Sequence, residues 1–408
     1  SKTNCDLIEN IDIGGPSMLR AAAKNHHHVV ALYSQDQYGL LIEHYGKNLG
    51  TTLAFRQALA ESTFYYSSSY DRNIANTFAE RFSQKTAPLT LDLTPLTALR
   101  YGENPHQQAS LFGMEQNKMR VSIPARSLTH QKELSYNNFL DTHAAIWALR
   151  CLCDQRSVAY ASVVIKHGVP CGAASATSLT EAIRKAIASD ETSAFGGVFA
   201  VSAPFEEDCV EIVEKRFIEL IVAPSFSDQA LAKLAHKKNL QLLAIDNLMS
   251  GTLDEMSYKS IFGGMLRQSQ DHAADHPSEW SVVTKTRPSP SQFLAMEFAF
   301  RLAKATPSNG ITIASPDQLF GVGAGQPSRI QSAKLALDGA KSRSFNLALA
   351  AMASDGFFPF GDSIELAHHH GLRAVIQPGG SIRDQEVIDQ ANQYGMTMVF
   401  THRRHFRH

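Results

Sequence analysis

The feature that most constrains the fold is a repeated alternation of short Val/Ile-rich runs with amphipathic segments. SVVIKH (162–167) is followed by SLTEAIRKAIASD (178–190) and then by GGVFAVS (196–202). The same rhythm returns near the C-terminus in LRAVIQ, IRDQEVIDQANQYG and MTMVFT (372–401). Strands that alternate with helices in this way are typical of α/β folds, so we expect an α/β protein.

The first part of the chain has a different, mostly helical pattern. PSMLRAAAKNH (16–26) and an Ala-rich stretch (51–82) predict helices, with a strand-like VVALYS (29–34) between them. Three prolines in QKTAPLTLDLTPLTALRYGENPHQ (84–107) then end the helical pattern. We therefore expect a domain boundary near residues 85–100.

Charge and composition exclude several classes of function. The 38 basic and 39 acidic side chains nearly cancel, and no run of Lys and Arg could follow a phosphate backbone, so we expect no nucleic-acid partner. No stretch approaches the roughly 18 apolar residues of a membrane span, and the first residues lack the pattern of a signal peptide. The five scattered cysteines favour reduced thiols over a disulfide framework. We expect a cytoplasmic protein without a membrane partner.

Lys166 and His167 form the clearest candidate for chemistry. They come at the end of a predicted strand and lead into a Gly/Pro loop, at the edge where open α/β sheets collect ligands. A histidine titrates near neutrality and is the usual general base, while an adjacent cation can stabilise a developing negative charge. A solvated lysine beside a loop histidine without a role is the alternative reading of the same pair.

Pro170 and Cys171 begin the P-C-x-x-C pattern of zinc deaminases. That site needs a second cysteine at position 174 and an upstream H-x-E. Position 174 is Ala174, and no H-x-E precedes it. We therefore predict no metal site here.

Other stretches resemble ligand loops or a structured tail. Glycines occur in ETSAFGGVFA (191–200), FGVGAGQPSRI (320–330) and IQPGGSIRD (376–384), where the backbone could approach a ring or an anion, although a plain capped turn fits the last equally well. The phenylalanines of SDGFFPFGDS (354–363) are either a small core or a stacking platform. The basic end FTHRRHFRH (400–408) is either frayed or held in a site.

These stretches, taken in order along the chain, resemble one family. The matching segments are RYGENPHQ, KELSYNNFLD, VIKHGVPCG, SAFGG, GGMLRQSQD, GAGQPSR, ASDGFFPFGD, IQPGGSIRD and RHFRH. They resemble the bifunctional purine biosynthesis proteins that combine 5-aminoimidazole-4-carboxamide ribonucleotide (AICAR) transformylase with IMP cyclohydrolase. ENIDIGGPSMLRAAAKNH (9–26) resembles a late part of the cyclohydrolase domain, whose earlier part would precede Ser1.

The resemblance implies a fold and a domain plan. Residues 1–95 would be a truncated remnant of a methylglyoxal-synthase-like α/β cyclohydrolase domain. Residues 96–408 would form the transformylase domain, as two cytidine-deaminase-like α/β subdomains without catalytic zinc, at about 96–280 and 281–408. The family also implies a homodimer whose active sites draw residues from both chains.

The resemblance also implies a reaction and its residues. The formyl group of 10-formyltetrahydrofolate, the co-substrate, would pass to the 5-amino group of AICAR, with a potassium ion near the site. His167 would act as base, Lys166 would stabilise the oxyanion, and Asn309 would orient the formyl group. The remaining matched positions are Arg100, Tyr101, Asn138, Phe195, Gly196, Arg329, Arg404 and His408 for AICAR, Phe357, Pro359 and Asp362 for folate, and Asp12 and Lys24 for the cyclohydrolase remnant.

Three positions depart from the family pattern. Val169 stands where the family has asparagine, Gly361 where it has arginine, and Ser315 near a position where it favours lysine. Each change removes a polar group near the expected site. Two alternatives to the transformylase therefore stay open: a full-length parent that also has IMP cyclohydrolase activity, and a degenerate, non-catalytic nucleotide or folate binder.

Overall fold

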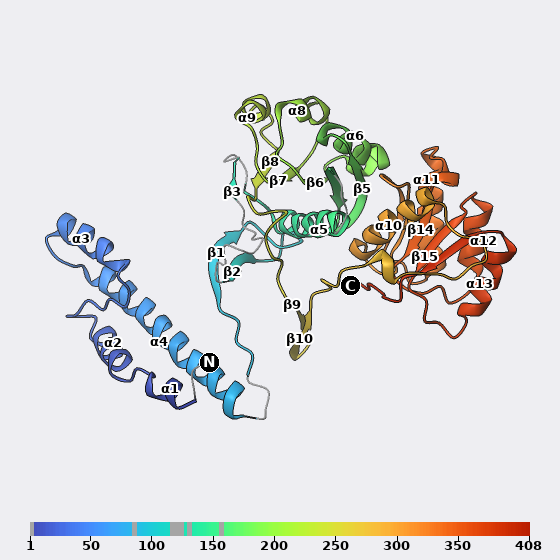
Figure 1. Cartoon of the computed structure of the whole chain (residues 1–408). Coiled ribbons are helices and arrows are strands. Elements are labelled where there is room, and N and C mark those ends of the chain that lie inside the picture. Colours follow the sequence, from blue (N-terminus) through green and yellow to red (C-terminus); the bar gives the residue numbers. More distant parts are fainter. Residues whose placement is uncertain (1–3, 84–87, 115–125, 129–132, 155–158) are drawn as a thin grey trace. The chain divides into compact units, whose positions relative to one another are not determined.

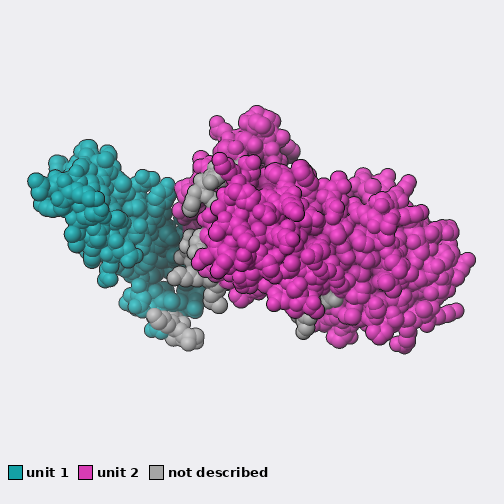
Figure 2. Space-filling view, turned by 90° about the horizontal axis from the view of Figure 1, so that it is seen from above, with its two compact units in different colours: residues 1–91 teal, residues 92–408 magenta. Residues whose placement is uncertain are grey.

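The computed structural model describes residues 4–83, 88–114, 126–128, 133–154 and 159–408. The chain divides into two compact units, Ser1–Leu91 and Asp92–His408, which Figure 2 colours separately. The first unit is helical in its described residues, and the second contains both large sheets of the protein (Figure 1).

The first unit is a small helical assembly. Its elements are α1 (Asn4–Glu9), α2 (Gly14–Lys24), α3 (Gln37–Asn48) and α4 (Leu53–Phe82). Thr52 caps α4 by accepting a hydrogen bond from the backbone N–H of Phe55, and α2 packs against α4 over buried alanines. The strand predicted at 29–34 is wrong, because that segment has no strand pairing in the described part of the unit. An isolated strand leaves its backbone groups without partners.

The first large sheet contains the predicted Lys166 strand. Its order is β3 (Arg126–Ser127), β8 (Gln241–Ala244), β7 (Leu220–Ala223), β6 (Val198–Val201), β4 (Tyr160–Lys166) and β5 (Val169–Ala176). The helices of this half are α5 (Tyr136–Cys153), α6 (Leu179–Ser189), α7 (Glu191–Ala194), α8 (Glu207–Glu214) and α9 (Asp228–Leu234). Strands β6, β7 and β8 are parallel, whereas β4 is antiparallel to both of its neighbours. The strands and the helix predicted at 162–202 are confirmed.

The second large sheet forms the C-terminal half of this unit. Its order is β11 (Ser281–Val282), β16 (Thr397–Phe400), β15 (Ala374–Gln377), β14 (Ala351–Ser354), β12 (Ile311–Ala314) and β13 (Leu319–Gly323). Its helices are α10 (Pro290–Ala305), α11 (Arg329–Ser342), α12 (Asp362–His369) and α13 (Asp384–Gln393), with short 3-10 turns η1 (Pro277–Glu279) and η2 (Leu347–Leu349). The strand, helix and strand predicted within 372–401 are confirmed.

The two sheets have the same strand order and the same strand directions. In each, an antiparallel hairpin forms one edge, three parallel strands follow, and a short antiparallel strand closes the other edge. Each hairpin also lies between two helices in the chain, α5 and α6 around the first and α10 and α11 around the second. The chain thus folds the same α/β pattern twice, and the α/β expectation is confirmed.

The two halves share one hydrophobic core. Helices α5 and α10 pack against each other, and fully buried Leu149, Phe298 and Phe300 lie in the cluster that joins them to both sheets. Burial of each such side chain contributes about 1.5–3 kcal/mol. The β4–β5 edge also meets the second half directly, because Ala174 bridges to Gln318. The shared core makes one body of the two repeats.

Two separate hairpins complete the second unit. They are β1 (Leu93–Leu99) with β2 (Ala109–Met114), and β9 (Met256–Ile261) with β10 (Gly264–Ser269). The residues of β10 are exposed along the whole strand. In the part of the chain that the structure describes, every helix is too short or too polar to cross a lipid bilayer.

Candidate active site

His167 lies at the tip of the β4–β5 hairpin. Lys166 at the end of β4 pairs with Val169 at the start of β5, so that only His167 and Gly168 form the loop. Their φ angles are +50° and +75°, as a type I′ turn requires at both central positions. The predicted Gly/Pro loop after Lys166 is therefore wrong: Val169–Ala176 is a strand. Pro170 fits within it because it lies on the edge strand, beside a register shift.

Lys166 is anchored to the turn that precedes β6. Its Nζ donates a hydrogen bond to the carbonyl oxygen of Gly196 at 2.8 Å. Gly196 has a φ of +66°, and a Cβ at this position would lie 3.1 Å from that Nζ. Phe195 is 65% exposed, and its ring lies 5.1 Å from the ring of Phe217. An ammonium group and an exposed aromatic face therefore border the hairpin tip.

Asp141 on α5 reaches this tip, and sequence reasoning missed it. Its Oδ1 accepts the backbone N–H of Gly168 at 2.7 Å. Burial raises the pKa of the Asp141 carboxyl, although hydrogen bonds from the turn and the charge of His167 oppose the rise. The sequence shows only that Asp141 is an acidic residue one turn inside a helix whose other residues are mostly apolar. This pattern does not identify Gly168, 27 positions away, as its partner.

A cavity of about 290 Å³ opens beside Lys166. It lies between the first hairpin and the second half of the unit, and its lining includes Val169, Cys171, Phe320 and Arg343. Burial raises the pKa of the Cys171 thiol to about 12, so the thiolate that a metal or an electrophile would need is scarce. The cavity therefore offers the Lys166 ammonium, an ion pair between Arg343 and Asp190, apolar groups and a protonated thiol.

A second group of predicted residues gathers around Arg329 at the start of α11. This buried guanidinium donates to Asn309 Oδ1 at 2.5 Å, to Asp355 Oδ1 at 2.8 Å and to Ser354 Oγ at 2.9 Å. Burial lowers the pKa of Arg329, and the charge of Asp355 opposes this. The Nδ2 of Asn309 donates to the carbonyl oxygen of Gln326 at 2.9 Å, which fixes the amide orientation. Asp355 was not predicted.

The C-terminal tail joins this second group and is not frayed. The backbone N–H of Ser308 donates to the carbonyl oxygen of Arg407 at 2.8 Å, and the Arg407 N–H donates to Ser308 Oγ at 3.1 Å. The guanidinium of Arg404 lies 4.7 Å from the Phe406 ring, and the His408 ring lies 6.1 Å from that ring. Arg404 and His408 are both exposed at this surface.

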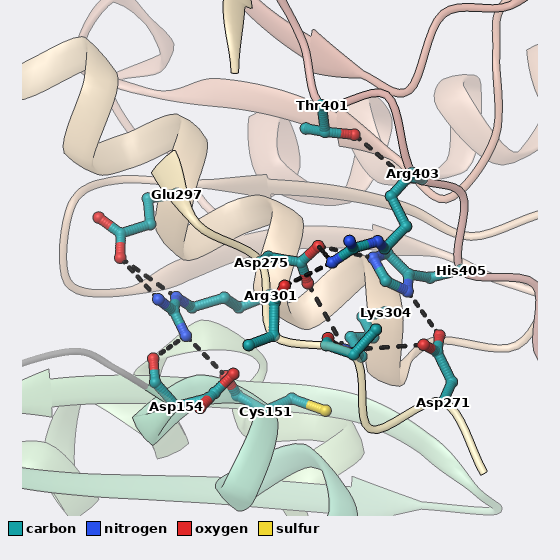
Figure 3. A network of polar contacts seen from close by, with 12 residues as sticks. Cys151, Asp154, Asp271, Asp275, Glu297, Arg301, Lys304, Thr401, Arg403 and His405 are labelled. Carbon is teal, nitrogen blue, oxygen red and sulfur yellow. Dashed lines mark hydrogen bonds and ion pairs between the residues drawn. The ribbon is translucent and has the colours of Figure 1, made fainter. Parts of the chain in front are cut away.

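A buried polar network holds the tail in place (Figure 3). The ring nitrogens of His405 lie 2.5 Å from Asp271 and 3.0 Å from Asp275, and Lys304 lies within 4 Å of both carboxylates. Burial lowers the pKa of His405, but hydrogen bonds to the two carboxylates outweigh it, and the net pKa is raised. Figure 3 also shows Arg301 bound to Glu297 beside this network.

The aromatic loop at 354–363 divides between core and surface. Phe358 is fully buried, whereas Phe357 is exposed and Pro359 is half-buried. Asp362 starts α12 at the surface and accepts the backbone N–H of Ser363. The small-core reading therefore holds for Phe358, and a stacking platform on exposed Phe357 stays a prediction.

The glycine-rich loops have mainly structural causes. A Cβ on Gly321 or Gly323 would lie about 2 Å from backbone oxygens of α11, so these glycines permit close packing of strand and helix. The Gly380 N–H donates to Asp384 Oδ2 at 2.6 Å, and the capped-turn reading of 376–384 therefore fits better than an anion site.

Other predicted residues lie outside these two groups. Arg100 stacks on Tyr101 at 5.5 Å in the segment after β1, and Asn138 forms the capping box of α5 with Ser135. Asp12 and Lys24 belong to the first unit, where Asp12 accepts the Gly15 N–H. Within the described ranges, neither Lys166 nor His167 forms a hydrogen bond or ion pair with the group around Arg329.

Comparison with known proteins identifies the family. A family model described as the AICARFT/IMPCHase bienzyme matches residues 22–339. The chain belongs to the AICARFT/IMPCHase family. The bifunctional purine biosynthesis proteins PurH of Streptococcus pneumoniae serotype 19F (strain G54) and serotype 2 (strain D39 / NCTC 7466) are 42% identical to it over 409 residues. Each match covers 100% of this chain and 78% of the relative.

A third relative extends the same result. PurH of Streptococcus pneumoniae strain P1031 is 41% identical over 409 residues, with the same coverage of both chains. The resemblance inferred from the ordered motifs is therefore confirmed at the level of the family. Both groups of residues described above lie in an AICARFT/IMPCHase chain.

Proposed function

We propose that this chain is a phosphoribosylaminoimidazolecarboxamide formyltransferase. It transfers a formyl group from 10-formyltetrahydrofolate to the 5-amino group of AICAR, giving formyl-AICAR and tetrahydrofolate in purine nucleotide biosynthesis. The observation that carries the proposal is the adjacent Lys166 and His167 at the tip of an ordered hairpin, in a member of the AICARFT/IMPCHase family.

The pair suits the chemistry of this amine. The lone pair of the 5-amino nitrogen is delocalised into the imidazole and carboxamide, so a base must act as the new C–N bond forms. His167 takes the amine proton, directly or through the neighbouring carboxamide. The formyl oxygen gains negative charge, which the Lys166 ammonium stabilises. The bond from the formyl carbon to N10 of the folate then breaks, and N10 takes up a proton.

The Lys166 ammonium has hydrogen-bond donors available for a substrate oxygen. An ammonium group has three donors, and one of them is directed at Gly196 in the structure. That contact fixes the side chain and leaves the other donors for a substrate oxygen. Asn309, whose amide is oriented by Arg329 and Gln326, is assigned to the formyl group.

The remaining assignments follow the family motifs. We assign folate to the exposed faces of Phe357, Pro359 and Asp362. We assign AICAR to Arg100, Tyr101, Asn138, Phe195, Gly196, Arg329, Arg404 and His408. The side-chain oxygen of Asn138 accepts two hydrogen bonds from Ser135 in the capping box of α5, so its amide nitrogen is the group assigned to AICAR.

We assign the two groups of residues to one active site formed across a homodimer. The Lys166 group of one subunit would face the Arg329 group of its partner, since neither hydrogen bonds nor ion pairs join them within the described chain. Mixing His167→Ala with Arg404→Ala tests this. Subunit exchange should restore up to about a quarter of the activity, because half of the dimers then contain one intact site. No recovery after exchange would contradict a shared site.

The same proposal covers the domain plan. Residues 1–95 are assigned to a cyclohydrolase-domain remnant that carries Asp12 and Lys24. Residues 96–408 are assigned to the transformylase domain, with cytidine-deaminase-like subdomains at about 96–280 and 281–408. The duplicated strand order supports two equivalent subdomains. A potassium ion near the site and a chemistry without zinc belong to the proposal as well.

Steady-state formyl transfer tests the function. We expect turnover of 10-formyltetrahydrofolate with AICAR, and a fall of about 10²–10⁴-fold in kcat for His167→Ala. Exposed Asp228→Asn on α9 is the control and should match the unmodified chain. Absence of turnover at high enzyme, with AICAR still bound tightly, would instead favour the non-catalytic binder.

A further inference from the structure

The turn that presents His167 needs support from outside the hairpin. Residues other than glycine rarely adopt positive φ, and each such residue costs about 1–2 kcal/mol. Type I′ turns accordingly favour Asn-Gly or Asp-Gly, whereas this one is His167-Gly168, with φ values of +50° and +75°. Strain of this kind persists where surrounding groups hold it in place.

Asp141 supplies that support. It lies in the second turn of α5, is half-buried, and accepts the Gly168 N–H at 2.7 Å. The adjacent His167 also acts to lower the pKa of this carboxyl. Backbone N–H groups of a tight turn can bind an anion, and here a carboxylate of the chain itself accepts the Gly168 N–H. The helix and the hairpin tip are thereby tied together.

Burial disfavours the charged form of the Asp141 carboxyl at this position. Burial raises the pKa of Asp141 above its ordinary 3.8, and the nearby charge of Glu219 acts in the same direction. A raised pKa in the folded state means that the fold accommodates a neutral group more readily than the charge at neutral pH. An asparagine of the same shape would therefore cost less stability, so a stability argument alone does not explain an aspartate here.

We propose that Asp141 is a positioning residue for formyl transfer, which fixes the His167–Gly168 turn through its carboxylate so that the imidazole stays aligned with the substrate amine. This inference rests on the proposed function. It assigns Asp141 no contact with either substrate. The role is distinct from that of His167, because Asp141 acts only through the backbone of the turn.

Activity measurements with paired variants test the inference. Asp141→Ala removes both the acceptor and the charge, whereas Asp141→Asn keeps an acceptor oxygen. We expect kcat to fall about 10²-fold in the first, as misplacement of a reacting group does. We expect a fall of about tenfold in the second, with KM for AICAR unchanged in both. The double variant with His167→Ala should be no slower than His167→Ala alone, because the two residues act as a unit.

Stability and NMR give readouts that do not depend on turnover. Asp141→Asn should melt at the same temperature as the unmodified chain or higher. The Gly168 amide resonance, recorded without substrate, should follow the titration of the Asp141 carboxyl and should shift upfield in Asp141→Ala. If Asp141→Ala does not fold, Asp141→Asn is used for both the activity and the stability measurements.

Different outcomes separate the inference from the proposed function. Unchanged kcat in both variants, a loss confined to KM, or losses that multiply with that of His167→Ala would overturn the role of Asp141 while formyl transfer stands. An unmodified chain without turnover would refute the proposed function. In that case the NMR titration still decides the inference. A Gly168 amide shift that does not change as the Asp141 carboxyl titrates would refute the hydrogen bond between carboxylate and turn, and a shift that follows the titration would support it.

Discussion

Replacement of His405 by alanine is expected to destabilise the second unit and to weaken catalysis together. The imidazole is only 1% exposed and lies between the carboxylates of Asp271 and Asp275. Loss of hydrogen bonds to charged partners costs about 1.5–3 kcal/mol, and breaking a fully buried ion pair about 3–5 kcal/mol. Asp271 is partly exposed and Lys304 still faces both carboxylates, so we expect a loss near the lower range, about 2–3 kcal/mol.

The loss should depend on pH in a defined direction. The folded pKa of His405 is raised above 6.5, because the two carboxylates outweigh the burial that lowers it. Its contribution is therefore complete below pH 6.5 and disappears as the pH rises through the folded pKa. The pKa values of Asp271 and Asp275 are lowered below 3.8 despite burial, so their contributions are lost only as the pH falls through those values. The difference between the two proteins should shrink at alkaline pH.

Thermal unfolding from pH 5 to pH 9 measures this difference, with kcat recorded on the same samples. His405→Ala should also lose formyl transfer, because His405 precedes Phe406, whose ring lies 6.0 Å from the Arg329 guanidinium and 6.1 Å from the His408 ring. Exposed His402→Ala serves as the control, since the His402 ring contacts only Ser281 and the Phe400 ring among the described residues and neither is charged. A melting temperature unchanged by His405→Ala, or a difference that stays constant up to pH 9, would refute the reasoning.

Further predictions concern strand packing, the site and the thiols. Gly321→Ala should cost about 1–3 kcal/mol or more, because its Cβ would lie 2.1 Å from the Ala336 carbonyl oxygen; unfolding in denaturant measures this, and an unchanged midpoint would contradict the packing. Val169→Asn places an amide beside Lys166 in the cavity and should raise kcat in the steady-state assay. An unchanged kcat would show that a polar group at this position does not affect the reaction. Iodoacetamide at pH 8 should modify exposed Cys5 well before buried Cys171, whose thiol pKa is about 12; mass spectrometry of the intact protein would reveal the reverse order.

Local patterns predicted the elements that depend on local periodicity. The apolar runs at 162–167 and 372–377 and the amphipathic helix at 178–190 follow from side-chain spacing alone, and the structure has them. The position of His167 at a strand end could also be predicted. The type of loop could not, because a two-residue turn depends on pairing between Lys166 and Val169.

Features that depend on partners far apart in the sequence could not be predicted. His405 meets Asp275 from 130 positions away, and nothing in RHFRH identifies that carboxylate. Asp141 is recognisable only once α5 lies against the hairpin. Gly321 was interpreted as a ligand glycine because sequence cannot distinguish close approach to a ligand from close approach to α11. The strand expected at 29–34 failed for the same reason, since a strand exists only with a partner.

The duplicated strand order has a consequence for how this protein can change. Only the first hairpin presents Lys166 and His167, whereas in the turn of the second, at 315–318, Ser315 bonds Asp317, which also pairs with Lys185 of the first repeat. The second repeat instead supplies buried Arg329 and the ordered tail. Under the proposed function, the two copies of one architecture have taken different roles, the first supplying the reactive pair and the second the groups that bind substrate. Sequence change in the second copy could then alter which molecule is bound while the reactive pair stays intact.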